Sequence, residues 1–196
     1  MLRNAVSRIH EMFNNRWLRS LLRKLRYGIF LVAIVVLIPQ IEPSWFLPGF
    51  FLCLLGESIQ LWCFASLDKN ATLAVKGPYT LMRNPMYIGR FFLLLGCLLL
   101  MGNIWIIIGF TLLYYFYMVN RVQREEGKLK RVFGEAYEDY CRKVNRFVPS
   151  FKGVAPGSLW FFRWELLLKN NGHWNALAVI ISFAAFYFFA FVYSAS

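Results

Sequence analysis

The chain has 196 residues, of which 59% are hydrophobic and 19% aromatic, and its mean hydropathy is +0.48. A soluble domain of this length needs a more polar surface, so the composition excludes an ordinary soluble protein and indicates one that lies in a lipid bilayer. The net charge is +12, and the basic residues gather in two stretches, residues 3–26 and 121–152. Membrane topology and anionic lipid account for this charge without nucleic-acid binding.

The N-terminal arm, residues 1–26, is basic and precedes an apolar stretch. Arg8 and Arg16 are interspersed with Ile9 and Phe13 in a pattern typical of an amphipathic helix that lies on anionic lipid headgroups. A solvated arm that only sets the topology explains the pattern equally well. No small-residue cleavage site follows the apolar stretch, so we expect an uncleaved anchor rather than a signal peptide.

Five apolar segments are predicted to cross the bilayer, for which a transmembrane helix needs about 20 residues. They are residues 27–41, residues 45–67, the two halves of residues 85–120, and residues 174–193. The first is short on its own but is extended by Leu21, Leu22 and Leu25. Gly102-Asn103 divides the long stretch with a tight turn.

The two basic stretches predict the orientation of these spans. Positively charged loops stay in the cytoplasm, and four spans lie between the two stretches, so the N-terminus is expected inside and the C-terminus outside. The predicted fold class is therefore all-α: a polytopic integral membrane protein with about five transmembrane helices.

The chain contains no repeat and no low-complexity tract, which predicts a single membrane domain over residues 1–196. It comprises the N-terminal arm, a core over residues 50–150, and an additional C-terminal helix over residues 174–194.

Cysteine and histidine offer little chemistry. Cys53, Cys63 and Cys97 fall inside apolar spans, and no CxxC or Cys/His cluster is present, so neither a disulfide nor a metal site is expected. His10 and His173 each stand alone near a membrane boundary, which argues against histidine-based catalysis.

"NRVQREEGKLKRVFGEAYEDYCRKV", residues 120–144, begins as an extension of the fourth span. Val122, Leu129 and Phe133 recur at helical spacing, and Gly134 is a natural place for that helix to end. A second, shorter helix is predicted to follow.

The stretch "GPYTLMRNPMYIGR", residues 77–90, is predicted to start the third span. Asn84 is expected to cap the free amides of the first turn with its side chain, and Pro85 suits the first helical position because it needs no donor there. The positive end of the helix dipole would then face the cytoplasm, where it suits a carboxylate or phosphate.

Small residues in the third and fourth spans have two interpretations. Close helix packing explains Gly96 and Gly109, whereas the absence of a side chain at Gly89 could also admit a ligand.

Arg90 is an ionisable residue inside a predicted span, which makes it a functional hypothesis by default. It could bind a phosphate or carboxylate of a lipid acceptor, pair with Glu57 in the second span, or extend to the interface. Glu57 and Gln60 lie one turn apart, and we expect them to make a polar contact that fixes helix packing.

Glu125 and Glu126 are adjacent carboxylates just beyond the fourth span. Such a pair alone usually belongs to a solvated helix face. Combined with Arg83 and Asn84 at the start of the neighbouring antiparallel helix, the pair predicts a polar pocket on the cytoplasmic side.

"GPYTLMRNPMYIG", followed about forty residues later by "REEGKLKRVFGEAYEDYCRKVNRFVP", resembles the superfamily of isoprenylcysteine carboxyl methyltransferases and phospholipid methyltransferases, in particular its small bacterial members. The resemblance covers about half of the chain. It implies a cytoplasmic cofactor pocket that holds S-adenosylmethionine, in a protein of a bacterial inner membrane, and a lipid-like or other hydrophobic acceptor that enters from the bilayer. The residues carried over as cofactor-binding are Tyr79, Arg83, Asn84, Pro85, Met86, Tyr87, Gly89, Glu125, Glu126, Tyr137, Tyr140 and Arg146.

Arg83, Asn84 and Arg90 are the residues assigned to catalysis. Many family members carry histidine where this chain has Asn84, and asparagine can neither act as a base nor take a charge near neutral pH. Two alternatives therefore stay open: an NADPH-dependent membrane reductase of related architecture, and a membrane scaffold without catalytic activity.

Overall fold

The computed structural model describes residues 2–68, 72–152 and 154–193. Every regular element in these ranges is helical, so the all-α prediction is confirmed for the part of the chain described. In chain order the α-helices are α1 (Leu2–Asn14), α2 (Arg16–Leu37), α3 (Phe46–Ser66), α4 (Pro85–Leu99), α5 (Ile104–Phe133), α6 (Glu135–Lys143), α7 (Pro156–Leu159), α8 (Trp164–Lys169) and α9 (Gly172–Tyr187). Short 3₁₀ turns at Ile38–Gln40, Pro43–Trp45 and Gly77–Thr80 lie between them, and a π-helical segment, Phe188–Tyr193, continues α9.

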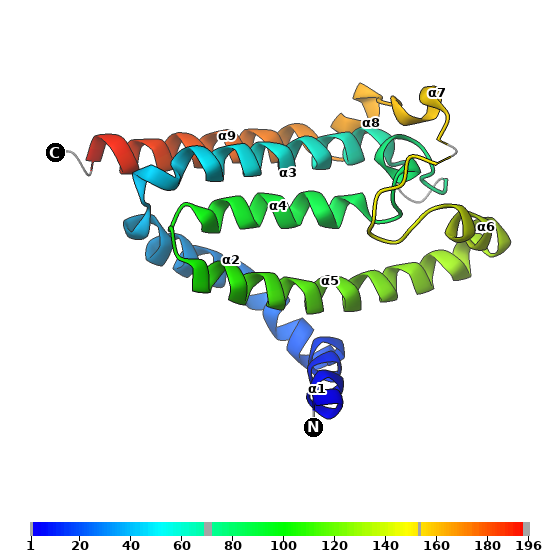
Figure 1. Cartoon of the computed structure of the whole chain (residues 1–196), viewed down its shortest axis with the longest axis horizontal. Helices are drawn as coiled ribbons and strands as arrows, with labels where there is room; N and C mark the ends of the chain where they lie inside the picture. The colour runs from blue at the N-terminus through cyan, green and yellow to red at the C-terminus, as the bar shows by residue number, and fades with distance from the viewer. Residues whose placement is uncertain (1, 69–71, 153, 194–196) are drawn as a thin grey trace.

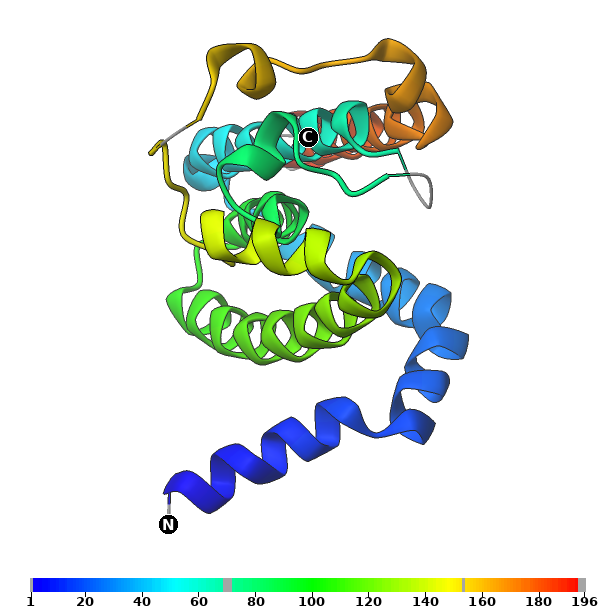
Figure 2. The ribbon, with the colours of Figure 1, turned by 90° about the vertical axis from the view of Figure 1, so that its right-hand side faces the viewer.

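Four helices run lengthwise beside one another (Figures 1 and 2). α4 lies between α3 and α5, and α9 lies against α3. Helices α6, α7 and α8 gather at one end of this bundle, and the C-terminal end of α9 lies at the other. The bundle thus separates its long apolar helices from one end that is built of short helices and loops.

Three segments in the described ranges are long and apolar enough to cross a membrane: Pro43–Ser66, Ile104–Phe133 and Gly172–Val192. α4 is apolar but has only 15 residues. The first predicted span falls in α2, which ends at Leu37 rather than Ile41 because Pro39 cannot continue the helical hydrogen bonding. The count of five spans and their orientation stay predictions.

The predicted turn between the third and fourth spans is confirmed. Gly102 has φ +60°, and a Cβ there would lie 2.8 Å from the Trp45 ring. Asn103 is the N-cap residue of α5, and its side-chain oxygen accepts hydrogen bonds from the amides of Trp105 and Ile106 at 3.0 and 3.4 Å. This side chain satisfies two amides that the helix leaves without a partner.

Replacing Asn103 by Ala should destabilise the protein by about 1 kcal/mol, the usual contribution of such a cap. The melting temperature of the detergent-solubilised protein measures the change. Asn103→Asp is the matched control, because it keeps the accepting oxygen and should melt near the parent protein. Equal losses in both variants would contradict the capping role.

α5 continues beyond its apolar part as predicted and ends at Gly134, whose φ is +53°. Lys130 Nζ and Glu138 Oε1, 2.8 Å apart, bridge the bend between α5 and α6. The hydrogen bond and charge of Lys130 lower the pKa of Glu138, so this carboxylate is ionised at neutral pH.

The C-terminal helix α9 joins α3 through both apolar and polar contacts. Phe46 and Phe183 contribute to the buried core between them. Asn175 Nδ2 donates to Glu57 Oε2 at 2.6 Å, and Glu57 Oε1 is buried without a partner among the described residues. Glu57 therefore makes the expected polar packing contact, but its partner is Asn175 and not Arg90.

Small residues allow α3 and α4 to approach closely. A Cβ at Gly56 would lie 2.4 Å from the Leu93 amide nitrogen, and one at Gly89 would lie 2.9 Å from the Gly56 carbonyl oxygen. Gly96 meets the backbone of α3 in the same way, as predicted, with the Gly49 oxygen 2.7 Å from its Cβ position. The packing role expected of Gly109 is wrong for the described chain, because nothing lies within 4 Å of a Cβ there.

Candidate functional site

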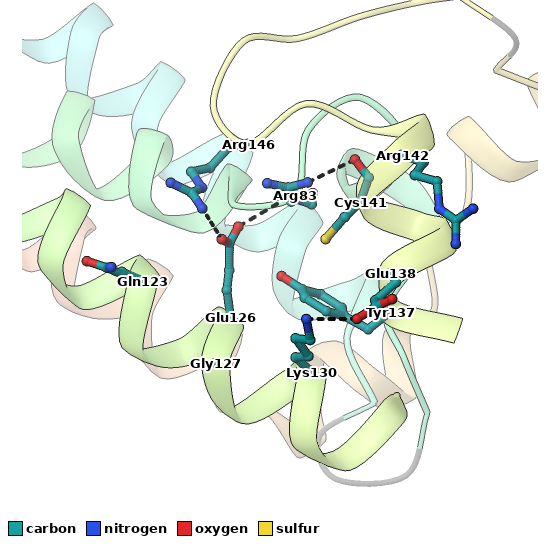
Figure 3. Close-up of a pocket in the computed structure, with 10 residues that line it drawn as sticks. All are labelled: Arg83, Gln123, Glu126, Gly127, Lys130, Tyr137, Glu138, Cys141, Arg142 and Arg146. Atoms are coloured by element: carbon teal, nitrogen blue, oxygen red, sulfur yellow. Dashed lines mark hydrogen bonds and ion pairs between the residues drawn. The ribbon is translucent and has the colours of Figure 1, made fainter. Parts of the chain in front are cut away.

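Three segments far apart in the sequence meet at the carboxylate of Glu126, at the short-helix end of the bundle (Figure 3). Glu126 lies on α5, is only 8% exposed, and faces Arg83 ahead of α4 and Arg146 after α6. Arg83 Nε lies 3.2 Å from Glu126 Oε1, and Arg146 Nη2 lies 2.7 Å from Oε2. Asn84 Nδ2 donates to Oε1 at 3.1 Å. Both motifs singled out in the sequence thus share one buried carboxylate.

Arg83 also holds the end of α6. Its Nη1 donates to the carbonyl oxygens of Cys141 at 3.0 Å and Val144 at 3.3 Å, and its backbone amide donates to Asn145 O at 2.8 Å. A guanidinium suits this place because the last carbonyls of a helix carry partial negative charge. Arg83 therefore positions α6 relative to α4 and α5.

The predicted capping role of Asn84 is wrong. Asn84 stands at the N-cap position and Pro85 follows at the first helical position, but the Asn84 side chain makes no cap hydrogen bond. Its amide group donates instead to Glu126 and, at 3.3 Å, to Arg146 O. A cap would need the Asn84 Oδ1 to accept from backbone amides, whereas the charge-assisted hydrogen bond to Glu126 uses the side-chain NH₂ and turns the side chain toward that carboxylate.

A cavity of about 580 Å³ opens beside Glu126, between α5 and α6 (Figure 3). Its volume lies within the range of small-molecule sites, about 300–1,000 Å³. Four basic and two acidic side chains surround it. The lining residues are Arg83, Gln123, Glu126, Gly127, Lys130, Tyr137, Glu138, Cys141, Arg142 and Arg146.

Four of the residues carried over from the family line this cavity: Arg83, Glu126, Tyr137 and Arg146. The Tyr137 hydroxyl is buried and has no hydrogen-bond partner in the part of the chain described. Burial raises the pKa of Tyr137, so its phenol keeps its proton at neutral pH. Tyr137 thus lines the cavity with its hydroxyl buried beside the Cys141 side chain.

Tyr79 and Tyr140 are buried and do not belong to the cavity lining. The Tyr140 hydroxyl donates to Tyr79 O at 2.7 Å and so fastens the Gly77–Thr80 turn to α6. Burial raises the pKa of both tyrosines, which keeps the Tyr140 donor protonated.

Tyr140→Phe should lower the free energy of unfolding by about 1–3 kcal/mol, because it leaves the buried Tyr79 carbonyl without its donor. Thermal unfolding in detergent measures the loss. Tyr115→Phe is the control, since Tyr115 is 55% exposed. A Tyr140→Phe protein that melts with the control would contradict the supporting role.

A second polar group lies on the other side of the same helices. Arg121 Nε donates to the Tyr87 hydroxyl at 3.3 Å, and Arg121 Nη2 lies 2.9 Å from Glu125 Oε1. The Arg90 guanidinium lies over the Tyr87 ring, 5.8 Å from its centroid. Consecutive helical residues point about 100° apart, which separates Glu125 from Glu126. The two glutamates, predicted to share one pocket, face different neighbours.

The remaining carried-over residues lie around the start of α4. Pro85 is fully buried, Met86 is half-buried, and Gly89 faces α3. None of the three lines the cavity, and their contact with a cofactor stays a prediction.

Sequence reasoning missed six of the lining residues. Gln123, Gly127 and Lys130 share the face of α5 that carries Glu126, because they stand three and four positions from it or from one another. Glu138, Cys141 and Arg142 belong to the corresponding face of α6. The helical spacing from Glu126 would have predicted the lining residues of α5 from the sequence.

Fold and site together define a helical membrane protein with an ionic cavity at the end of its apolar helices. Residues 44–136 match the family model described as phospholipid methyltransferase. This confirms the resemblance predicted from the two motifs. The matched region contains Arg83, Asn84 and Glu126, whereas Arg146, α9 and the N-terminal arm lie outside it.

Individual relatives agree with the family match. The chain is 36% identical over 87 residues to a protein-S-isoprenylcysteine O-methyltransferase from Xenopus laevis, over 44% of this chain and 30% of the relative. It is 32% identical over 94 residues to one from Schizosaccharomyces pombe, over 48% of this chain and 40% of the relative. These matches thus span less than half of either relative. The cobalt-zinc-cadmium resistance protein CzcN from Cupriavidus metallidurans is 25% identical over 174 residues, which cover 82% of this chain and 80% of the relative.

Proposed function

We propose that the protein is an S-adenosylmethionine-dependent methyltransferase that acts on a lipid-like or other hydrophobic acceptor in the membrane. The family match and the names of the relatives support a membrane methyltransferase. The observation that carries the proposal for this chain is the junction at Glu126, where Arg83 and Asn84 from one motif meet the glutamate of the other beside a cavity.

The residues around the cavity fit the cofactor. Arg142 and Arg146 suit its carboxylate, and the ionised Glu138 suits its ammonium group. The volume of about 580 Å³ is adequate for a ligand of this class. When bound, S-adenosylmethionine supplies an electrophilic methyl group on a sulfonium.

The chain's own residues act in this proposal by binding and orientation. Glu126 holds Arg83 and Arg146 in place, and Arg83 in turn holds the end of α6, so the three groups preorganise the cavity wall. Alignment of two reactants can supply much of the catalytic effect when no difficult proton transfer is needed. Asn84 cannot act as a base, so in this role it orients the Glu126 carboxylate.

The acceptor is proposed to approach from the bilayer. α5 carries exposed apolar side chains such as Ile108 and Leu112 along its length, and Arg90 lies near the end of α4 that leads to the site. A cation at that depth suits an acceptor with an anionic group next to its apolar part. In this proposal the cavity end of the bundle faces the cytoplasm.

Isothermal titration of the detergent-purified full chain with S-adenosylmethionine, S-adenosylhomocysteine and NADPH tests the proposal. We expect binding of the first two ligands but not of NADPH, and loss of binding in Glu126→Gln. Glu165→Gln is the control, because the Glu165 side chain is 80% exposed and lies on α8. Radiolabelled methyl transfer to membrane lipids would then identify the acceptor. A folded protein that binds neither methyl-donor ligand would refute the proposal.

A further inference from the structure

The N-terminal helix α1 contacts the rest of the molecule through polar side chains. Asn14 Nδ2 donates to Asn120 Oδ1 at 2.8 Å, and Asn120 Nδ2 lies 2.8 Å from His10 Nδ1. Arg124 Nη1 also donates to Asn14 Oδ1. His10 packs edge-on against the Phe116 ring, 5.5 Å between centroids. α1 is therefore held on α5 by a polar cluster formed by His10, Asn14, Asn120 and Arg124.

Several apolar side chains of the N-terminal arm are exposed and take no part in the contact between α1 and α5. Val6 is 41% exposed, Met12 is 51% exposed, and Trp17 at the start of α2 is 71% exposed. An amphipathic helix on a water-soluble bundle buries its apolar face and exposes its polar one. On α1 the apolar Ile9 and Phe13 are half-buried, and Arg8 and Glu11 are exposed, so the bundle covers the apolar face of the helix only in part. The exposure of Val6, Met12 and Trp17 is favourable only if another apolar medium covers them.

The position of α1 identifies that medium. α1 lies across the direction of the long helices, not along it (Figures 1 and 2). It meets α5 at Asn120, where the apolar residues that begin at Ile104 end and Arg121 follows. A helix placed across a bundle at the depth where a spanning helix changes from apolar to charged sequence lies at the level of a membrane interface.

The charge of the arm selects the lipid. Seven basic residues and one acidic residue, Glu11, lie within residues 1–26. Arg8, Arg16 and Lys24 are exposed. Clusters of basic residues beside exposed apolar ones bind bilayers that contain anionic lipid.

We propose that α1 and the first part of α2, as far as Lys24, form an interfacial anchor that binds the surface of an anionic bilayer. Val6, Met12 and Trp17 insert below the headgroups, Arg8, Arg16 and Lys24 contact the anionic headgroups, and the polar cluster fixes the anchor to α5. The anchor thereby adjoins Arg121, which contacts Tyr87 and Glu125. This assignment replaces the solvated arm that the sequence left equally open, and it does not depend on the enzymatic proposal.

Spin labels at neighbouring positions of the full-length protein test the anchor. Val6→Cys places a label on the open apolar face, and Ser7→Cys is the matched control on the polar face, with the labelled parent chain as the blank for native cysteines. The measured quantity is the ratio of the spin label's collision rate with oxygen to its collision rate with a water-soluble nickel chelate. In vesicles of phosphatidylcholine and phosphatidylglycerol, oxygen collisions should exceed nickel collisions several-fold at position 6. At position 7 the nickel collisions should exceed the oxygen collisions.

A second set of measurements tests the dependence on lipid charge. The oxygen-to-nickel ratio at position 6 should fall several-fold in vesicles of phosphatidylcholine alone, and likewise when Arg8→Gln and Arg16→Gln are added in anionic vesicles. Equal nickel accessibility at positions 6 and 7 in anionic vesicles would overturn the anchor and establish a solvated arm. If the ratio at position 6 did not change in phosphatidylcholine vesicles, or did not change in the variant that lacks Arg8 and Arg16, the proposed preference for anionic lipid would be overturned.

Discussion

Glu126→Ala should abolish S-adenosylmethionine binding and methyl transfer and lower the free energy of unfolding by about 3–5 kcal/mol, the usual effect of removing one member of a buried ion pair. The side chains of Glu126 and Arg83 are only 10% and 12% exposed, so Arg83 would keep its charge with little water to solvate it. Arg146, at 46%, would be solvated and contribute less. Titration calorimetry measures the binding, and chemical or thermal unfolding in detergent measures the stability.

Glu125→Ala is the control that the structure provides one residue away. The Arg121 and Glu125 side chains are 47% and 39% exposed, so their ion pair should contribute no more than about 1 kcal/mol. We expect this variant to fold like the parent and to lose little cofactor affinity. Comparable losses of affinity in the two variants would contradict the separation of the glutamates and restore the shared pocket that the sequence predicts.

Several helix ends were predictable from the sequence. The span predicted over residues 45–67 is observed as α3, Phe46–Ser66, within one residue at each end. Gly102-Asn103 and Gly134 mark helix ends through local signals, because both glycines have positive φ and the Asn103 side chain caps the start of α5. The first span was extended too far, to Ile41, because its apolar composition outweighed the effect of Pro39.

The site was predictable as a meeting of motifs but not in its bonding. The topology of two antiparallel helices brings Arg83 and Asn84 to the level of Glu126. The sequence around Asn84 predicts a helix cap, but its side chain instead donates to the Glu126 carboxylate, which lies 42 residues away in the sequence. This partner becomes visible only in the folded chain. The contact of Glu57 with Asn175 spans 118 residues and joins two helices whose pairing follows only from the assembled bundle.

The two tyrosines of α6 also have roles that the sequence does not separate. Its tyrosines were expected to line a pocket, yet Tyr140 supports the Gly77–Thr80 turn while Tyr137 faces the cavity. The two lie three positions apart on a nine-residue helix and point to different neighbours. The helical period predicts that they share a side of α6, but only the packed partners separate the supporting residue from the lining one.

Gly56→Ala should destabilise the bundle by about 1–3 kcal/mol, the usual range for overpacking a tight contact. The added Cβ would lie 2.4 Å from the Leu93 nitrogen and 2.6 Å from the Gly89 oxygen, and both are backbone atoms that cannot rotate away. α3 and α4 must therefore separate. Since α4 follows directly from Arg83 and Asn84, cofactor affinity should fall together with the melting temperature, although position 56 lies outside the cavity lining.

Gly109→Ala distinguishes this steric effect from the loss of a flexible glycine. Nothing in the described chain lies within 4 Å of a Cβ at Gly109, so only helix propensity remains, and alanine should leave the melting temperature unchanged or raise it by the equivalent of up to about 1 kcal/mol. A Gly56→Ala protein that melts like Gly109→Ala would show that α3 and α4 do not pack this closely. Lowered stability with unchanged cofactor affinity would instead show that the site tolerates a displaced α4, and that Arg83 is held by α5 and α6 alone.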